Sequence, residues 1–539
     1  MSSLLIRNAH AYIERGHFEE ALLIEDGIIR AVGKEADLRA QAPGAQEWDA
    51  RGRTIVPGFV DSHQHLLNTG VMLSDVRLQN AKSIADVKRI TREYIEARKP
   101  APGTVLHGMG WNQDYFTDEA RMLTRDDLDA ITTEYPLVFE RACGHMLTAN
   151  SAALARAGVD DSAVAPEGGS IERDANGRLN GIFTENARAP LLMLFRNRTP
   201  EEDVALIRTA MRHAAECGVT SVHTCDIRGG TWETVLEAYT RVMADHPLVR
   251  VWHQSSFQSS MEDFKRFLAA GHVMGAGNAL HRFGPLKLFV DGSLGARTAF
   301  MRKPYHDDPS TVGIPTMTPE EIREFIAVAK AHNTGVVTHA IGDGAIERIL
   351  NAYDEVCDGK NPLRHGVIHI QITDRPLLER FTKNSILALV QPIFLHYDTK
   401  IVEDRVGKEL AATSYAFGTL KKLGIHMSFG TDSPIEDMNP IDNLYCAINR
   451  RRLDGTPEGG FHPEECVDIY DAVDAYTIEG AYASFEEKVK GRLMPGYYAD
   501  LVVLSENIFE MDPLRLRETK VDATMMNGEF VFERAEASK

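Results

Sequence analysis

Two rhythms of hydrophobic and polar positions divide this chain of 539 residues. Near both ends, short apolar runs alternate with turn residues, at 3–33, in ADLVVLSENIF (499–509) and in ATMMNGEFVFER (523–534). Such runs predict short β-strands, and Asn527-Gly528 predicts a tight hairpin between two of them. Neither end has enough apolar residues for a core of its own, so we expect both ends to combine into one small β domain.

Between the ends, β-rich apolar runs alternate with helical segments. Eight such runs can be counted, which is the strand number of a closed (β/α)₈ barrel of the TIM type. The runs are IVPGFVDSHQH (55–65), VTSVHTCD (219–226), LVRVWHQSSF (248–257), GPLKLFVDGS (284–293), TGVVTHAIGD (334–343), HGVIHIQ (365–371), SILALVQPIF (385–394) and HMSFGTDSP (426–434).

Two helices are marked at their starts. Thr199-Pro200-Glu201-Glu202 and Thr318-Pro319-Glu320-Glu321 each place Thr at the N-cap, Pro at the first position and Glu at the third. In the first, an apolar stripe follows at helical spacing. Each of these helices leads into a strand, as a barrel requires.

The chain therefore divides into three expected parts. Residues 1–56 and 490–539 form a composite β-sandwich, and 57–489 form the barrel. The stretch from about 66 to 195 is too long for one crossover, so we expect an insertion after the first barrel strand, over the active-site face.

Composition narrows the class of protein. The formal net charge is −19, which argues against a nucleic-acid partner. The first residues lack the pattern of a signal peptide, and no apolar run reaches the length of a membrane span. We expect a cytoplasmic protein with a small-molecule substrate and no membrane partner, and a homodimer is one oligomeric state to consider. The six scattered cysteines argue against a disulfide framework: Cys143, Cys217, Cys225, Cys357, Cys446 and Cys466.

The first barrel run ends in VDSHQH. On a strand, alternate residues point the same way, so His63 and His65 face one side together with Asp61. Two converging imidazoles suit a metal ion, but this spacing alone supports metal ligation and a crowded strand equally.

Other strand ends favour the metal. His339, His369 and Asp432 fall at the ends of the fifth, sixth and eighth runs. The carboxyl ends of barrel strands converge on one site, and four histidines with one aspartate suit a divalent metal such as zinc. An unrelated core role is plausible for any one of these residues, but poor for all of them together.

Lys287 interrupts the apolar run LKLFVDG, where a bare ammonium group is costly to bury. Three readings stay open: a neutral amine with a depressed pKa, an amine carbamylated by CO₂ that bridges two metals, and an ion pair with Asp291 or another carboxylate.

These segments together carry a resemblance. PGFVDSHQH, LKLFVDGSLGARTA, THAIGDGAIERIL, RHGVIHIQ, FGTDSPIEDMNP and the tail AYTIEGAYASFEEKVKGRLMPGYYADLVVL resemble the amidohydrolase superfamily. More narrowly they are similar to its branch of N-substituted formamide deformylases and related metal-dependent hydrolases. The resemblance covers nearly the whole chain.

The resemblance implies roles for single residues. His63, His65, His339 and His369 become metal ligands, Lys287 a carboxylated bridge, and Asp432 the acid and base. The metal is then most simply zinc, as one ion or two. In one departure, Ile368 stands where the branch usually has Glu before the last histidine, which weakens any transfer of substrate.

Other residues resemble pocket-lining segments of the same branch, which implies a role in substrate binding: Trp111, Asn112, His145 and Glu185. The expected reaction is hydrolysis of a non-peptide carbon–nitrogen bond, such as an N-substituted formamide, by metal-activated hydroxide. An ester or lactone hydrolase, a deaminase, or a metal-holding binding protein without turnover are the alternatives. The deaminase needs a glutamate soon after His339, and Glu347 lies too far along the helix.

Overall fold

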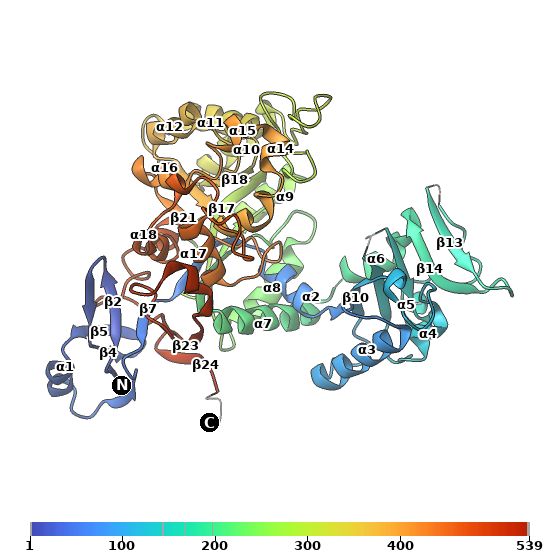
Figure 1. Cartoon of the computed structure of the whole chain (residues 1–539), viewed down its shortest axis with the longest axis horizontal. Helices are drawn as coiled ribbons and strands as arrows, with labels where there is room; N and C mark the ends of the chain where they lie inside the picture. The colour runs from blue at the N-terminus through green and yellow to red at the C-terminus, as the bar shows by residue number, and fades with distance from the viewer. Residues whose placement is uncertain (1–2, 143–144, 167, 197, 536–539) are drawn as a thin grey trace. The chain divides into compact units, whose positions relative to one another are not determined.

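The computed structural model describes residues 3–142, 145–166, 168–196 and 198–535. The chain divides into two compact units (Figure 1). One comprises Met1–Thr69 and Ala210–Lys539, and the other comprises Gly70–Thr209. None of the described helices is long and apolar enough to cross a bilayer.

The first unit contains an eight-stranded parallel sheet that forms the expected barrel. Its order is β21-β20-β19-β18-β17-β16-β15-β8, so strands consecutive in the barrel lie side by side. The eight strands are β8 (Phe59–Gln64), β15 (Val219–Thr224), β16 (Arg250–Ser255), β17 (His281–Phe289), β18 (Val336–Ala340), β19 (Gly366–His369), β20 (Leu387–Val390) and β21 (Met427–Phe429). Each lies within or overlaps one of the eight apolar runs.

Hydrogen bonds connect the first and last barrel strands. Ser62 Oγ donates to the carbonyl of Phe429 at 2.8 Å. Beyond the end of β21, the backbone N–H of Asp432 donates to the carbonyl of His63 at 2.8 Å. The barrel is thus nearly closed, and its closing seam passes directly beside two of the predicted site residues.

Helices connect the barrel strands. α10 (Pro319–Ala331) begins as predicted, because the Thr318 hydroxyl accepts from the N–H of Glu321 and the Glu321 carboxylate accepts from the N–H of Thr318. α7 (Pro200–Glu216), which leads into β15, has the same reciprocal pair between Thr199 and Glu202. Both helix starts are therefore confirmed.

Strands from the two chain ends form the small β domain. One sheet has the order β5-β4-β1-β6, and the other has the order β24-β23-β22-β7-β2-β3. Ile6, Ile55, Leu501 and Met525 share one buried core although they are far apart in the sequence. The strands are β1 (Ser3–Arg7), β2 (His10–Glu14), β3 (His17–Glu19), β4 (Ala21–Glu25), β5 (Ile28–Gly33), β6 (Gln46–Asp49), β7 (Thr54–Pro57), β22 (Leu501–Leu504), β23 (Val521–Met526) and β24 (Glu529–Glu533).

The predicted hairpin at Asn527-Gly528 connects β23 and β24. Both turn residues have positive φ, 55° and 80°, as a two-residue type I′ turn requires. The core shared by strands from both chain ends, together with the hairpin between β23 and β24, confirms that the sandwich is built from both termini.

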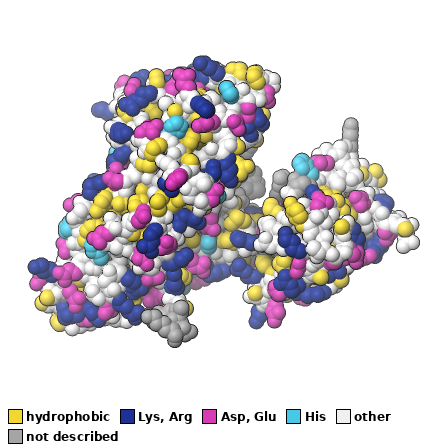
Figure 2. All heavy atoms as spheres, viewed as in Figure 1, with side chains coloured by type: hydrophobic (Ala, Val, Ile, Leu, Met, Phe, Trp, Pro, Cys, Tyr) yellow, Lys and Arg dark blue, Asp and Glu magenta, His cyan; other side chains and the backbone are white. Residues whose placement is uncertain are grey.

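The unit Gly70–Thr209 follows the first barrel strand, as an insertion there requires. Its own sheet has the order β13-β14-β12-β11-β10-β9. The strands are β9 (Val76–Arg77), β10 (Leu106–Trp111), β11 (Leu137–Arg141), β12 (Met146–Ala149), β13 (Gly169–Arg173) and β14 (Leu179–Glu185). On the face shown in Figure 2, acidic and basic side chains are interspersed in each unit.

Candidate active site

The predicted ligands lie at the carboxyl ends of barrel strands. His63 is the penultimate residue of β8, and His65 directly follows that strand. His339 and His369 lie at the ends of β18 and β19. Asp432 follows β21. Because parallel strands of a barrel end on the same face, these residues meet there.

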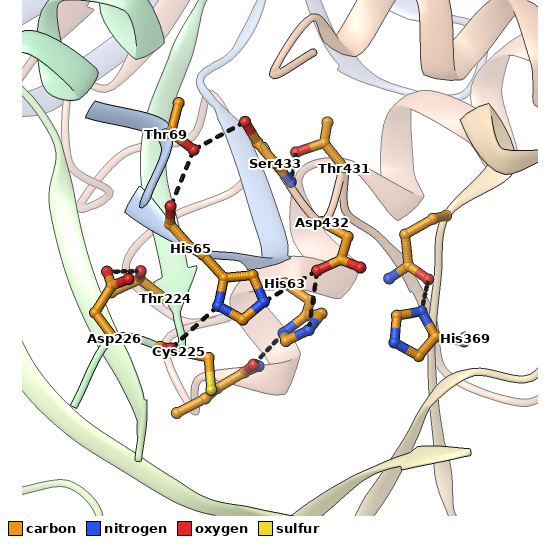
Figure 3. Close-up of polar contacts among 12 residues, drawn as sticks. His63, His65, Thr69, Thr224, Cys225, Asp226, His369, Thr431, Asp432 and Ser433 are labelled. Carbon is orange, nitrogen blue, oxygen red and sulfur yellow. Dashed lines mark hydrogen bonds and ion pairs between the residues drawn. The ribbon is translucent and has the colours of Figure 1, made fainter. Parts of the chain in front are cut away.

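Distances show how closely they meet. One oxygen of Asp432, Oδ1, lies 3.2 Å from Nε2 of His65 and 3.5 Å from Nε2 of His63 (Figure 3). Ligand atoms of His63, His369 and Asp432 all lie within 4.8 Å of one another. The His339 ring centroid is 4.4 Å from that of His369, so the fourth histidine adjoins the same cluster.

Hydrogen bonds orient the imidazoles. Nδ1 of His63 lies 2.5 Å from Oε1 of Gln254. The orientation of this amide is fixed, because its Nε2 donates to the carbonyl of Ser62. Nδ1 of His369 lies 2.8 Å from Oε1 of Gln391. Since each partner oxygen only accepts, each Nδ1 carries the proton and each Nε2 keeps its lone pair for a ligand.

The other two histidines are oriented by backbone carbonyls. Nδ1 of His65 lies 3.1 Å from the carbonyl oxygen of Cys225 and 3.2 Å from Nη2 of Arg228, and its Nε2 points to Asp432. His339 has the opposite arrangement, because its Nε2 lies 2.9 Å from the carbonyl of Gly292. Its Nδ1 is therefore the nitrogen available to a metal.

Burial keeps the central imidazoles neutral. His63 and His369 are 1% and 3% exposed. Burial lowers the pKa of both well below the usual histidine value, and the positive charge of Lys287 acts in the same direction. Neutral imidazole is the form that binds a metal.

The converging atoms form a set of acceptors. Nε2 of His63 presents its lone pair to Oδ1 of Asp432, which Nε2 of His65 also faces, and this oxygen is buried without a hydrogen-bond partner. Acceptors that face one another in a buried place repel unless a cation or a proton lies among them. The residues therefore fit a divalent metal.

Asp432 is held in an unusual conformation. Its φ is +56°, in the left-handed region that non-glycine residues rarely adopt. The following Ser433 carbonyl accepts from the N–H of His65 at 2.7 Å. Asp61 fastens the same loop, because its carboxylate accepts from the hydroxyl of Thr431 at 2.5 Å. Asp61 thus positions the loop. Its carboxylate is occupied by these hydrogen bonds from Thr431, although it shares a face of the strand with the histidines.

Lys287 is fully buried, and its Nζ has no hydrogen-bond partner. Burial lowers its pKa to about 8. Asp291, the ion-pair partner left open by the sequence, instead accepts from the backbone N–H groups of Phe300, Ile341 and Gly342. The described structure thus does not show the ion pair, and the other two readings of Lys287 stay open.

Ile368 occupies an apolar environment. It is fully buried in a cluster with Val337, Leu387 and Leu389. A glutamate in this cluster would be costly, so the departure from the branch pattern agrees with the local packing.

The four predicted substrate-binding residues belong to the unit Gly70–Thr209. Trp111 is fully buried in the core of that unit, and its indole N–H donates to the carbonyl of Phe139. Asn112 caps a short helical turn, with its side chain accepting from the N–H of Asp114. His145 and Glu185 are exposed and lie 3.1 Å apart. Their role in substrate binding remains a prediction.

No positioning role was predicted from the sequence for Gln254, Gln391 or Asp291, and only Asp291 was named there, as a partner for Lys287. Each stands at or just after the end of a barrel strand, in WHQS, LVQP and FVDG. A polar residue at the end of an apolar run could have indicated each of them. In the sequence, this criterion was applied to the histidines, Lys287 and Asp432, but not to glutamine.

Comparison with known proteins agrees with this geometry. The model of the Amidohydrolase family matches residues 46–532, and residues 21–45 match an imidazolonepropionase-like composite domain of bacteria. The chain belongs to the amidohydrolase family. As an enzyme of this family it is a hydrolase of carbon–nitrogen bonds, and its cluster of histidines and Asp432 fits a metal-dependent one.

Several relatives match over nearly their whole length. The chain is 31% identical to the Bacillus subtilis protein YtcJ, named as an amidohydrolase, with 98% of each chain covered. It is 27% identical to the N-substituted formamide deformylase of Arthrobacter pascens, with 99% of each covered. The crystal structure of an uncharacterized metal-dependent hydrolase from Pyrococcus horikoshii OT3 aligns with a TM-score of 0.77 and 27% identity, covering 95% of this chain and 99% of that one.

Proposed function

We propose that this amidohydrolase cleaves a non-peptide carbon–nitrogen bond in a small molecule, with N-substituted formamides as the first substrate class to test. The observation that carries the proposal is the convergence of His63, His369 and Asp432 within 4.8 Å in a buried place. The formamide class rests on the likeness to the Arthrobacter pascens deformylase.

The metal in this proposal is zinc, as one ion or two. His63 and His65 would hold one ion beside Asp432, and His339 and His369 would hold a second ion next to it. Nitrogen and carboxylate ligands at buried strand ends suit zinc. A bound divalent metal would lower the pKa of a water molecule to roughly 7 and polarise the substrate carbonyl.

Lys287 would complete a two-metal site as a carbamate. In this reaction the neutral amine forms a bond to the carbon of CO₂ and loses one proton to solvent, which leaves an anion on the side chain. This proposal is supported by the Nζ of Lys287, which is buried and has no hydrogen-bond partner. A carbamate would put negatively charged oxygens that can bind metal in the place of this unpaired amine.

Asp432 would handle the protons. Its Oδ1 has no hydrogen-bond partner and faces the ligand side of His63 and His65. A carboxylate at this place can accept a proton from the attacking water and return it to the amine that leaves. The products of a formamide substrate would be formate and an amine.

The deaminase alternative lacks its glutamate. Glu347, the candidate after His339, lies 3.8 Å from the guanidinium of Arg302, and it is 43% exposed. An ester or lactone hydrolase remains the nearer alternative because the attack on the carbonyl is the same.

The test combines metal analysis with a substrate panel. Purified protein would be assayed for bound metal and then offered N-substituted formamides, other small amides, lactones and aminated heterocycles. We expect bound divalent metal and release of formate with an amine. Metal binding without hydrolysis of any compound would support the binding-protein alternative, and lactone hydrolysis alone would overturn the carbon–nitrogen assignment.

A further inference from the structure

A second group of ligand-type side chains lies outside the candidate active site. His213 is in the last turn of α7, and Cys217 directly follows that helix. Residues four apart on a helix lie on the same face, so the imidazole and the thiol are neighbours. Asp437, from the loop after β21, reaches the same place.

The distances match a metal site. Nε2 of His213 lies 3.1 Å from Oδ1 of Asp437 and 3.8 Å from Sγ of Cys217. All three ligand atoms lie within 4.8 Å of one another. Nitrogen, oxygen and sulfur atoms bound to one tetrahedral zinc would be about 3.4–3.6 Å apart, given the usual bond lengths. Small side-chain adjustments would therefore place an ion among them.

We propose that His213, Cys217 and Asp437 form a second metal site, which takes a zinc-type divalent ion. Zinc binds thiolate, imidazole and carboxylate ligands, whereas calcium and magnesium bind oxygen ligands and not sulfur. Cys217 is a free thiol, so it is available as a ligand. The side chains of His213 and Asp437 are 23% and 65% exposed, which leaves room for water at a fourth position.

The competing description is an ion pair without metal. Hydrogen bonds to Asp437 and Cys217 raise the pKa of His213 to about 10, so in that description the imidazole is protonated. A metal would displace this proton and the thiol proton. The two descriptions differ in what cobalt and chelators do to the protein, so they can be separated directly.

The position of the site suggests its role. Asp437 lies in the loop that also carries Asp432, and His213 lies on the helix that leads into β15. A shared ion would fasten this loop to α7. We therefore expect the ion to stabilise the fold, with little direct effect on the chemical step.

The test uses the full chain, in which Co²⁺ replaces every bound metal ion, including those of the candidate active site. A cobalt–thiolate bond gives a charge-transfer absorption band in the near ultraviolet, and the catalytic ligands proposed above include no sulfur. We expect this band in the unaltered protein and its loss in Cys217→Ser. Cys466→Ser, at another half-buried free thiol, is the matched control and should keep the band.

Metal content and stability complete the test. Cys217→Ser and Asp437→Asn should each bind one ion fewer per chain and lose the rise in melting temperature that added Zn²⁺ gives the unaltered protein, while retaining turnover. The absence of a thiolate band, or a band that persists in Cys217→Ser, would overturn the proposal. Equal zinc stoichiometry in all variants would also overturn it.

Discussion

Oδ1 of Asp432 lies 3.2 Å from Nε2 of His65, across the seam where the first and last barrel strands meet. The backbone at this seam is doubly connected, because the N–H of Asp432 donates to His63 and the N–H of His65 donates to Ser433. The carboxylate is therefore placed by the closure of the barrel, independently of any bound ion.

The first prediction concerns this carboxylate. Asp432→Asn should lower kcat by roughly 10²- to 10⁴-fold, because an amide cannot take up the proton of the attacking water. Bound metal and melting temperature should change little. Asp404→Asn, at an exposed acid of the short helix α14 (Val402–Val406), is the control and should retain full turnover. Near-normal kcat in Asp432→Asn would show that another group moves the proton.

The second prediction concerns Gln391, which accepts from Nδ1 of His369. Gln391→Leu removes the acceptor and frees the ring to rotate or change tautomer, so metal affinity should fall by roughly 10- to 100-fold. Gln391→Glu keeps an acceptor oxygen and should bind metal far more tightly than the leucine variant. Competition with a chelator of known affinity would measure both, and equal affinities would argue that the hydrogen bond has no positioning role.

Much of the barrel could be predicted because each strand is a short apolar run bounded by turn or polar residues. The ends of those runs also indicated His339, His369 and Asp432, since a barrel brings strand ends together wherever they fall in the sequence. The fold of residues 70–209 was not predicted, because its strands lack a repeating order with helices that would indicate their pairing.

Contacts between elements far apart in the sequence could not be predicted either. His213 and Asp437 are 224 positions apart, and no local pattern relates them. The amide side chains that orient His63 and His369 were missed for a different reason. Glutamine at a strand end is common, and its meaning depends on the ring that it faces.

The third prediction uses two buried lysines. Lys287 has no hydrogen-bond partner, whereas Lys490 lies 2.6 Å from the carboxylate of Glu486 and donates to the hydroxyl of Ser221. Lys287→Met should therefore raise the unfolding free energy of the metal-free protein, by about 1–3 kcal/mol, because an unsatisfied buried amine is removed. Lys490→Met should destabilise the protein, because the buried Glu486 keeps only Arg282, 3.5 Å away, as a cationic partner. The loss should stay below the roughly 3–5 kcal/mol expected for a fully unpaired buried charge.

Denaturant unfolding of both variants, after chelation, measures these changes. Activity should behave differently, since Lys287→Met should lose turnover in the presence of metal if the lysine helps to hold it. A destabilised and fully active Lys287→Met would contradict both statements. Mass spectrometry of the intact native protein would separately show whether one CO₂ is attached.

The last prediction concerns the unit Gly70–Thr209, where His107 of β10 lies between two carboxylates. Its ring nitrogens are 3.0 Å from Asp75 and 3.1 Å from Glu140. Burial alone would lower the pKa of His107, but hydrogen bonds to both acids overcome it and raise the pKa to about 9. Because the folded pKa is raised, the stabilisation is fully present below the unfolded value of about 6.5 and is lost as the pH rises toward 9.

Hydrogen exchange can measure this loss locally. Protection factors of amides in β10 and β11, corrected for the intrinsic pH dependence of exchange, should fall between pH 6.5 and 9 in the unaltered protein. His107→Gln cannot carry the charge, so its protection should be lower at pH 6.5 and nearly constant across this range. A parallel decline in both proteins would mean that some other group governs the stability of this unit.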